Sequence, residues 1–356
     1  MPSSTLAVVA FAGLMILGAL IGFVVPRLWH GLGSVGTAAW LALTAGALTA
    51  LLVLAALLTW ARRMRWPARL ALLVAVAVTL YGLGLPTGLA TAAVFPPRAD
   101  LGNRTPADLG LAGAEVRFTT ADGVRLAGWY VPSSTGAAVA VVPGATSSRT
   151  GVLGQAAVLA RRGYGVLLVD PRGMGHSDGH GMNLGWTGDL DLVAAVDFLA
   201  ARPDVRPTRI GLLGESLGGE MAIGSAGTDP RVGAVVAEGA TNRVAADKAW
   251  LTSVYGVRGT AQRAVDHVTQ TLTSLASGTA PPASLASSAR ATAPRPILLV
   301  AAGEVPDEQH AATWIAASRS HVSIWVVPGA QHTGGLTAQP REWEKRVIDF
   351  FDHALR

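Results

Sequence analysis

The hydrophobic positions of this chain follow two different patterns in its two parts. Near the N-terminus, three long apolar stretches carry no charged residue, at residues 6–25, 38–60 and 70–95. Each is long enough to cross the roughly 30 Å hydrocarbon core of a bilayer as a helix, and a helix satisfies its own backbone hydrogen bonds in lipid. The pattern predicts three membrane-spanning helices, the third kinked or shortened at Pro86.

Two other interpretations of these stretches are disfavoured. A buried hairpin of a soluble protein does not explain three such runs in succession. A cleaved signal peptide would carry a positively charged leader, but no Lys or Arg lies between Met1 and Val25, and further apolar stretches follow.

The charges of the short loops predict an orientation. The loop at 26–37 contains one arginine, whereas the loop at 61–69 contains Arg62, Arg63, Arg65 and Arg69. Because Lys and Arg are enriched in cytoplasmic loops, we expect this second loop to be cytoplasmic. A multi-pass membrane protein follows, with everything after about residue 100 outside the cytoplasmic face; only Arg98 and Arg104 oppose this.

Beyond the membrane region (1–99) and a Pro/Gly-containing linker (100–114), the pattern changes. Residues 115–119 and 124–131 alternate as a hairpin around a turn at Asp122-Gly123. Short apolar runs then alternate with helical spacing. Strands are expected at 137–142, 166–169, 209–213, 231–237, 297–301 and 322–327, and helices at 151–162, 189–201, 308–318 and 340–354. This order predicts an α/β domain over 115–356 with a doubly wound, mostly parallel sheet, interrupted at 239–294 by a lid.

One strand leads into a catalytic motif. Gly214-Glu215-Ser216-Leu217-Gly218 follows an apolar run and precedes a helical segment, which is the context of a nucleophile elbow. A serine on such a sharp turn takes a strained backbone conformation, so the residues two before and two after it must be small. We expect Ser216 to be the nucleophile.

Two further segments support a family resemblance. Asp170-x-Arg172-Gly173-x-Gly175-x-Ser177 follows the fourth expected strand, and Gly329-x-x-His332-x-x-Gly335 follows the last. With the elbow after the fifth strand, residues from about 115 to the end resemble an α/β-hydrolase, and the Ser, acid, His order fits. The resemblance implies a serine hydrolase of the esterase or lipase type, and His332 as the catalytic base.

The residues themselves also favour His332 among the eight histidines. His332 lies in a glycine-flanked loop beyond the carboxyl end of a strand, where the sites of open α/β sheets gather. The acid is less clearly determined. The resemblance implies an Asp three residues after Gly303, but that position is Pro306. We expect Asp307 as the acid. Glu308 and then Glu304 are the alternatives, and Glu238, after the preceding strand, is the least favoured candidate.

The oxyanion hole needs two backbone amides. We expect the amides of Leu217, directly after the nucleophile, and of Ala145, in the loop after the third strand. Pro143-Gly144 stands there where many relatives carry His-Gly. Asp170 and Arg172 are expected to have structural roles. No metal or phosphate-binding motif is evident, so no cofactor is expected.

Composition narrows the partners. The formal charge is +5, but the first 100 residues hold six of the 28 basic residues and one of the 23 acidic ones, so the remainder is balanced. This disfavours nucleic acid, and the absence of cysteine excludes disulfides. The expected function is hydrolysis of a small-molecule or lipid ester at a membrane through an acyl-enzyme. A peptidase or amidase, or a non-catalytic surface domain, are the alternatives, and the oligomeric state stays open.

Overall fold

The computed structural model describes residues 59, 62, 64–317 and 319–356 of the chain. The predicted spans at 6–25 and 38–60 therefore lie outside the described residues, apart from Thr59. The described chain divides into two compact units. The helical unit comprises the residues up to Pro97 together with Thr260–Ser277, and the sheet unit comprises Arg98–Gly259 and Gly278–Arg356. The predicted domain limits stay predictions.

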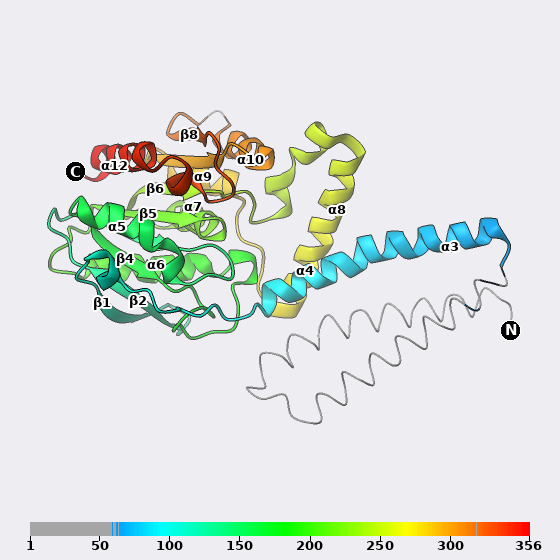
Figure 1. Cartoon of the computed structure of the whole chain (residues 1–356), viewed down its shortest axis with the longest axis horizontal. Helices are drawn as coiled ribbons and strands as arrows, with labels where there is room; N and C mark the ends of the chain where they lie inside the picture. The colour runs from blue at the N-terminus through cyan, green and yellow to red at the C-terminus, as the bar shows by residue number, and fades with distance from the viewer. Residues whose placement is uncertain (1–58, 60–61, 63, 318) are drawn as a thin grey trace, which may run out of the picture. The chain divides into compact units, whose positions relative to one another are not determined.

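The sheet unit is built on one eight-stranded sheet of order β1-β2-β4-β3-β5-β6-β7-β8. Figure 1 labels β1, β2, β4, β5, β6 and β8. β2 pairs antiparallel with β1 and β4, and the other neighbours pair in parallel. The prediction of a mostly parallel sheet begun by a hairpin is confirmed. The strands are β1 (Ala114–Thr119), β2 (Arg125–Val131), β3 (Ala138–Val142), β4 (Gly165–Val169), β5 (Ile210–Glu215), β6 (Val232–Glu238), β7 (Ile297–Ala302) and β8 (Val322–Val327).

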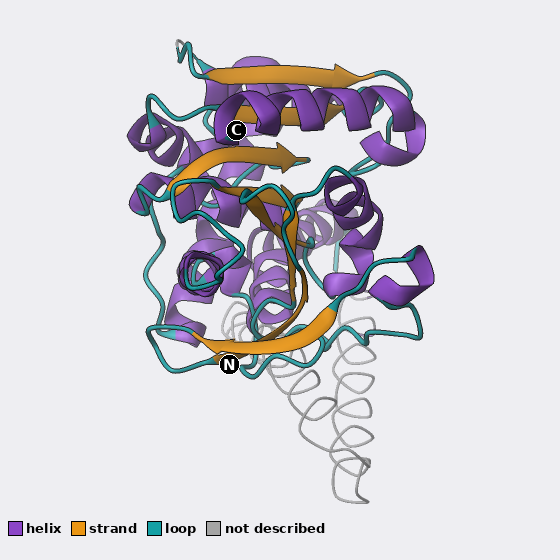
Figure 2. Ribbon diagram, turned by 90° about the vertical axis from the view of Figure 1, so that its left-hand side faces the viewer, coloured by secondary structure: helices purple, strands orange, loops and turns teal. Residues whose placement is uncertain are grey.

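Helices cover both faces of this sheet (Figure 2). Its helices are α5 (Leu153–Arg161), α6 (Gly188–Ala200), α7 (Leu217–Thr228), α9 (Leu285–Thr292), α10 (Pro306–Ala316), α11 (Gly335–Ala338) and α12 (Pro340–Leu355), with 3-10 turns η2 (Pro106–Leu109), η3 (Arg149–Val152), η4 (Asn183–Gly185) and η5 (Ala245–Lys248). One hydrophobic core contains residues of α6, α7, α9 and α10, and the other contains residues of α5 and α12.

The central strand β3 is apolar at every position because both of its faces are buried. In β3, Ala138, Ala140 and Val142 belong to one core, whereas Val139 and Val141 belong to the other. Successive side chains of a strand point to opposite faces. A continuous apolar run of strand length is therefore what a parallel strand between two helix layers requires.

The helical unit contains α3 (Trp66–Thr79), a π-helical segment η1 (Leu80–Gly84) and α4 (Leu85–Val94). Together they form one helix, Trp66–Val94, that is long and apolar enough to cross a membrane, with a mean hydropathy of 2.0. It begins four residues before the predicted third span. Pro86 is the second residue of α4, directly beyond the π-helical segment, and the helix continues past it to Val94, so this stretch is not shortened at Pro86.

The predicted lid has two structural parts. α8 (Leu251–Ser277) changes direction at Gly256, whose φ of 57° and ψ of −127° are not helical, and its residues from Thr260 onward belong to the helical unit. α9, in contrast, buries Leu285 and Ala289 in the core of the sheet unit. The predicted insertion at 239–294 thus includes one helix that covers the sheet.

Candidate active site

Ser216 lies at a strained turn between β5 and α7. Its φ of 51° and ψ of −121° place it in a region that side-chain-bearing residues rarely adopt. The Ser216 amide donates a hydrogen bond of 2.7 Å to the carbonyl of Glu238 at the end of β6. The neighbouring strand thus fixes the backbone of the turn, and the strain predicted for Ser216 is confirmed. Backbone strain of this kind persists where the surrounding structure determines it.

The two glycines of the motif are required by close backbone packing. A Cβ on Gly214 would lie 2.2 Å from the carbonyl oxygen of Gly218. A Cβ on Gly218 would lie 2.5 Å from the carbonyl oxygen of Pro143. Both distances are far shorter than a van der Waals contact between carbon and oxygen, so the expectation that these positions must be small is confirmed.

Ser216, His332 and Glu308 form one hydrogen-bonded chain. Nε2 of His332 lies 2.9 Å from Oγ of Ser216, and Nδ1 of His332 lies 2.6 Å from Oε1 of Glu308. An ionised carboxylate can only accept a hydrogen bond, so Nδ1 of His332 carries a proton and donates it. In the neutral ring, Nε2 of His332 is then unprotonated and accepts a hydrogen bond from the Ser216 hydroxyl. This is the order of contacts found in Ser–His–acid triads.

Glu308 is placed for this contact by the start of α10. Its side chain is 2% exposed, and its second oxygen accepts a hydrogen bond of 2.8 Å from the amide of Ala302, the last residue of β7. Glu308 also lies in the first turn of α10, where a negative charge is favourable. The hydrogen bond to Glu308 raises the pKa of His332, while partial burial of the ring acts in the opposite direction.

Asp307, the residue predicted as the acid, does not contact His332. Its carboxylate accepts a hydrogen bond from the hydroxyl of Tyr255 in α8. The prediction that Asp307 is the acid is therefore wrong. The first alternative, Glu308, is the carboxylate hydrogen-bonded to His332. α10 begins at Pro306, so Asp307 and Glu308 are consecutive helical residues and point in directions about 100° apart, as 3.6 residues per turn require. Glu304 precedes the helix and is exposed.

Glu238, the least favoured candidate for the acid, contacts the segment that carries His332. Its Oε1 accepts a hydrogen bond of 2.7 Å from the amide of Gly335, and its Oε2 accepts one of 2.8 Å from Nε1 of Trp343. Glu238 is buried at the end of β6. It therefore ties the loop between His332 and α12 to the sheet.

A further buried carboxyl, Glu215, lies directly before Ser216 and was not singled out from the sequence. It accepts a hydrogen bond from Nε2 of Gln155 in α5. Burial, together with the nearby charge of Glu238, raises the pKa of Glu215 to about 8, so it is mostly protonated at neutral pH. The sequence contained an indication of this buried carboxyl, because Glu215 is the one charged residue of an otherwise apolar strand.

The predicted oxyanion donors lie on the two loops that meet at Ser216. Leu217 is the first residue of α7, and the first amides of a helix have no acceptor within it. In the facing loop, a Cβ on Gly144 would lie 3.1 Å from Cβ of Ser216, and Ala145 follows. The roles of the Leu217 and Ala145 amides stay predictions.

Asp170 and Arg172 hold loops in place. The Asp170 carboxylate accepts hydrogen bonds from the amides of Arg149 and His176. Arg172 donates to Asp191 in α6 and to Asp122 in the first hairpin. Both side chains are buried. Asp170 connects the loop after β4 to the segment after β3, and Arg172 connects the same loop to α6 and to the first hairpin.

Comparisons with known proteins bear on the fold and the family of the chain. The sheet and the serine elbow define the chain as an α/β-hydrolase of the serine hydrolase type. Residues 152–356 match the model of the prolyl oligopeptidase family, and the chain belongs to that family. The esterase Pf2001 of Pyrococcus furiosus has a similar structure, with a TM-score of 0.59 and 26% identity, over 74% of this chain and 99% of the esterase.

Two curated relatives match a shorter part. A Mycobacterium tuberculosis protein of uncharacterised function is 40% identical over 118 residues, which is 32% of this chain and 41% of that protein. Polyketide transferase ATR5 of Stachybotrys chlorohalonatus is 38% identical over 132 residues, which is 35% of this chain and 43% of that protein. The chain thus matches less than half the length of these relatives. Within the described residues, no group of three or more metal-ligating side chains occurs.

Proposed function

We propose that the chain is a membrane-anchored serine hydrolase that cleaves carboxylic esters through an acyl-enzyme. The observation that carries the proposal is the hydrogen-bonded chain from Ser216 through His332 to Glu308. A serine hydroxyl is a weak nucleophile until a neighbouring base takes its proton, and this arrangement supplies that base.

The proposed reaction has two stages. Oγ of Ser216 attacks the ester carbonyl while Nε2 of His332 takes the hydroxyl proton, and Glu308 stabilises the imidazolium. The tetrahedral oxyanion is bound by the amides of Leu217 and Ala145. The C–O bond then breaks, and His332 gives its proton to the departing alcohol. In the second stage His332 activates a water molecule, which releases the acid and restores Ser216.

A peptidase or amidase is the second candidate, because the family whose model matches this chain is that of prolyl oligopeptidase. The same groups cleave amides by the same stages. The likeness to an esterase over almost the whole length of that protein favours esters.

A matched pair of substrates separates these candidates. The full chain in detergent would be given an ester and the amide of the same acyl group, and turnover measured for each. We expect turnover of the ester and no measurable turnover of the amide. Because esters are intrinsically more reactive than amides, a faster rate on the ester alone does not decide between the candidates, whereas steady turnover of the amide would favour the peptidase. Labelling by a fluorophosphonate probe tests catalysis itself: Ser216→Ala is expected to abolish it, and an unlabelled wild-type chain would favour the non-catalytic alternative.

The proposed membrane anchor includes the helix Trp66–Val94. At about 1.5 Å per residue, its 29 residues span roughly 43 Å, more than the roughly 30 Å hydrocarbon core. We include the two earlier apolar stretches as spans and place the sheet unit outside the cytoplasmic face, because of the arginines at 62–69. Alkaline phosphatase fused after Arg356 is expected to be active. Fluorescence from a reporter that matures only in the cytosol would contradict this orientation.

A further inference from the structure

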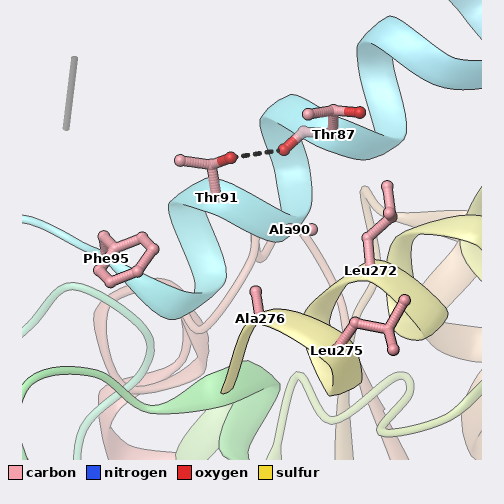
Figure 3. Close-up of a pocket in the computed structure, with 7 residues that line it drawn as sticks. All are labelled: Thr87, Ala90, Thr91, Phe95, Leu272, Leu275 and Ala276. Atoms are coloured by element: carbon pink, nitrogen blue, oxygen red, sulfur yellow. Dashed lines mark hydrogen bonds between the residues drawn. The ribbon is translucent and has the colours of Figure 1, made fainter. Parts of the chain in front are cut away.

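The helical unit contains a cavity that shares no lining residue with the candidate active site. It has a volume of about 290 Å³ and lies between the C-terminal end of the Trp66–Val94 helix and the end of α8 (Figure 3). The lining residues come from both segments: Thr87, Ala90, Thr91, Phe95, Leu272, Leu275 and Ala276. We call this cavity the apolar slot.

The two threonines do not give the slot polar character. The hydroxyl of Thr87 donates a hydrogen bond of 2.7 Å to the carbonyl of Leu83. Figure 3 shows the second bond, of 2.7 Å, from the hydroxyl of Thr91 to the carbonyl of Thr87. Each hydroxyl proton is therefore used within the helix. The other lining side chains are hydrocarbon, and none of the seven is charged. A ligand in the slot would be bound by burial of apolar surface and not by hydrogen bonds.

The surroundings of the slot indicate the kind of ligand. The Trp66–Val94 helix exposes a series of large apolar side chains up to the slot, among them Leu83, Leu85 and Leu89 at 42–44% exposure. Across the slot, Leu275 is 77% exposed, although α8 also carries polar residues such as Arg263 and Asp266. A series of exposed apolar side chains along one helix, unlike a single exposed leucine, indicates contact with something other than water.

We propose that the apolar slot binds one hydrocarbon chain of a membrane lipid. Its volume lies near the lower end of the range for ligand pockets, which suits a single acyl chain and not a whole lipid with its headgroup. The continuous apolar surface of the Trp66–Val94 helix gives such a chain a path from the bilayer. The inference rests on the proposed membrane association and is independent of ester hydrolysis.

Photolabelling of the full chain tests this inference. The chain would be reconstituted in phosphatidylcholine vesicles that contain a small fraction of phosphatidylcholine with a diazirine near the end of one acyl chain. After illumination, the labelled peptides would be identified by mass spectrometry. We expect label on the exposed side chains of α3, as for any inserted helix, and also on Leu272–Ala276 of α8. Label on α3 without label on Leu272–Ala276 would overturn the inference.

Matched tryptophan variants assign the label to the slot. Ala90 lines the slot and is buried, whereas Ala92 lies on an exposed part of the same helix. We expect Ala90→Trp to fill the slot and reduce the label on Leu272–Ala276 at least five-fold, with Ala92→Trp close to wild type. If Ala90→Trp fails to fold, Thr87→Trp, at a half-buried lining position, makes the same test. Equal label in the slot variant and in Ala92→Trp would overturn the inference.

Two controls separate this inference from the other proposals. Flotation with the vesicles reports membrane association, and a chain that does not float would overturn both the anchor and the slot. Fluorophosphonate labelling of Ser216 reports the active site, and we expect it to be unchanged in Ala90→Trp. A chain that floats and labels in the slot but does not react with the probe would leave the slot supported and contradict the hydrolase.

Discussion

The loops after β5 and β7 supply the serine and the acid of the candidate active site, and the structure positions these two residues by different means. In the elbow after β5, close backbone contacts around Gly214 and Gly218 leave one geometry, and Ser216 takes its strained conformation within it. In the loop after β7, a Cβ on Gly303 would lie 2.5 Å from the carbonyl oxygen of Val327, but this contact does not distinguish Asp307 from Glu308. The position of Glu308 depends on where α10 begins and on the amide of Ala302. A sequence motif therefore identifies Ser216, whereas Glu308 is identified only by the direction in which its side chain leaves α10.

The largest expected effect concerns the elbow and the histidine that it meets. Ser216→Ala and His332→Ala should each reduce ester hydrolysis by on the order of 10³-fold or more, because the members of a triad act as a unit. Circular dichroism and thermal unfolding check that the sheet unit remains folded. Near-wild-type turnover in Ser216→Ala would refute the assignment of the nucleophile.

The next effect compares the two adjacent acids directly. Glu308→Gln should reduce kcat by roughly 10²- to 10⁴-fold, since the carboxylate orients the imidazole and stabilises its charged form. Asp307→Asn is the matched control and should change kcat by less than about three-fold, because Asp307 bonds to Tyr255. A crippled Asp307→Asn with an active Glu308→Gln would restore the acid first expected from the sequence.

The pH dependence sharpens the same comparison. Glu308 raises the pKa of His332, and His332 must be neutral to accept a proton, so activity is lost as pH falls through this raised pKa. In Glu308→Gln the cause of the increase is removed, and the acidic limb of the residual kcat/KM profile should move to lower pH. Asp307→Asn should leave it in place. A limb that moves equally in both variants would contradict the pairing of His332 with Glu308.

The stability of the sheet unit is expected to depend on the close backbone packing of the elbow at Gly214. Gly214→Ala should destabilise the sheet unit by about 1–3 kcal/mol or more, as overpacking does, because its Cβ would meet the backbone of Gly218. Gly154→Ala in α5 is the control, since the one contact within 4 Å there is the end of the Leu336 side chain. The midpoint of thermal or denaturant unfolding measures both. Equal midpoints would show that the elbow accommodates a methyl group.

The smallest effect concerns the contact between β6 and the histidine loop. Glu238→Gln keeps one acceptor oxygen but loses the second, so one of the hydrogen bonds to Gly335 and Trp343 is weakened. We expect kcat to fall by roughly ten-fold with little change in KM, since His332 is displaced and substrate binding is not. A rise in KM alone would place Glu238 in substrate binding instead.

The alternation of strands and helices could be predicted from the amino-acid sequence, because apolar periodicity follows directly from burial on two faces of a sheet. Ser216 and the histidine that contacts it could be predicted as well. Gly214 and Gly218 flank the serine within five residues, and His332 lies in a glycine-flanked loop after the last strand. Those features are local, so they can be recognised without the fold.

The carboxylate that contacts His332, and the partners of Glu215 and Glu238, could be identified only from the folded chain. Asp307 and Glu308 are neighbours in sequence with the same charge, and a rotation of about 100° along a helix separates the one that bonds to Tyr255 from the one that bonds to His332. Glu238 and Trp343 are far apart in the chain, and the sheet brings them into hydrogen-bonding distance. Such choices depend on where elements begin and pack, which periodicity alone does not contain.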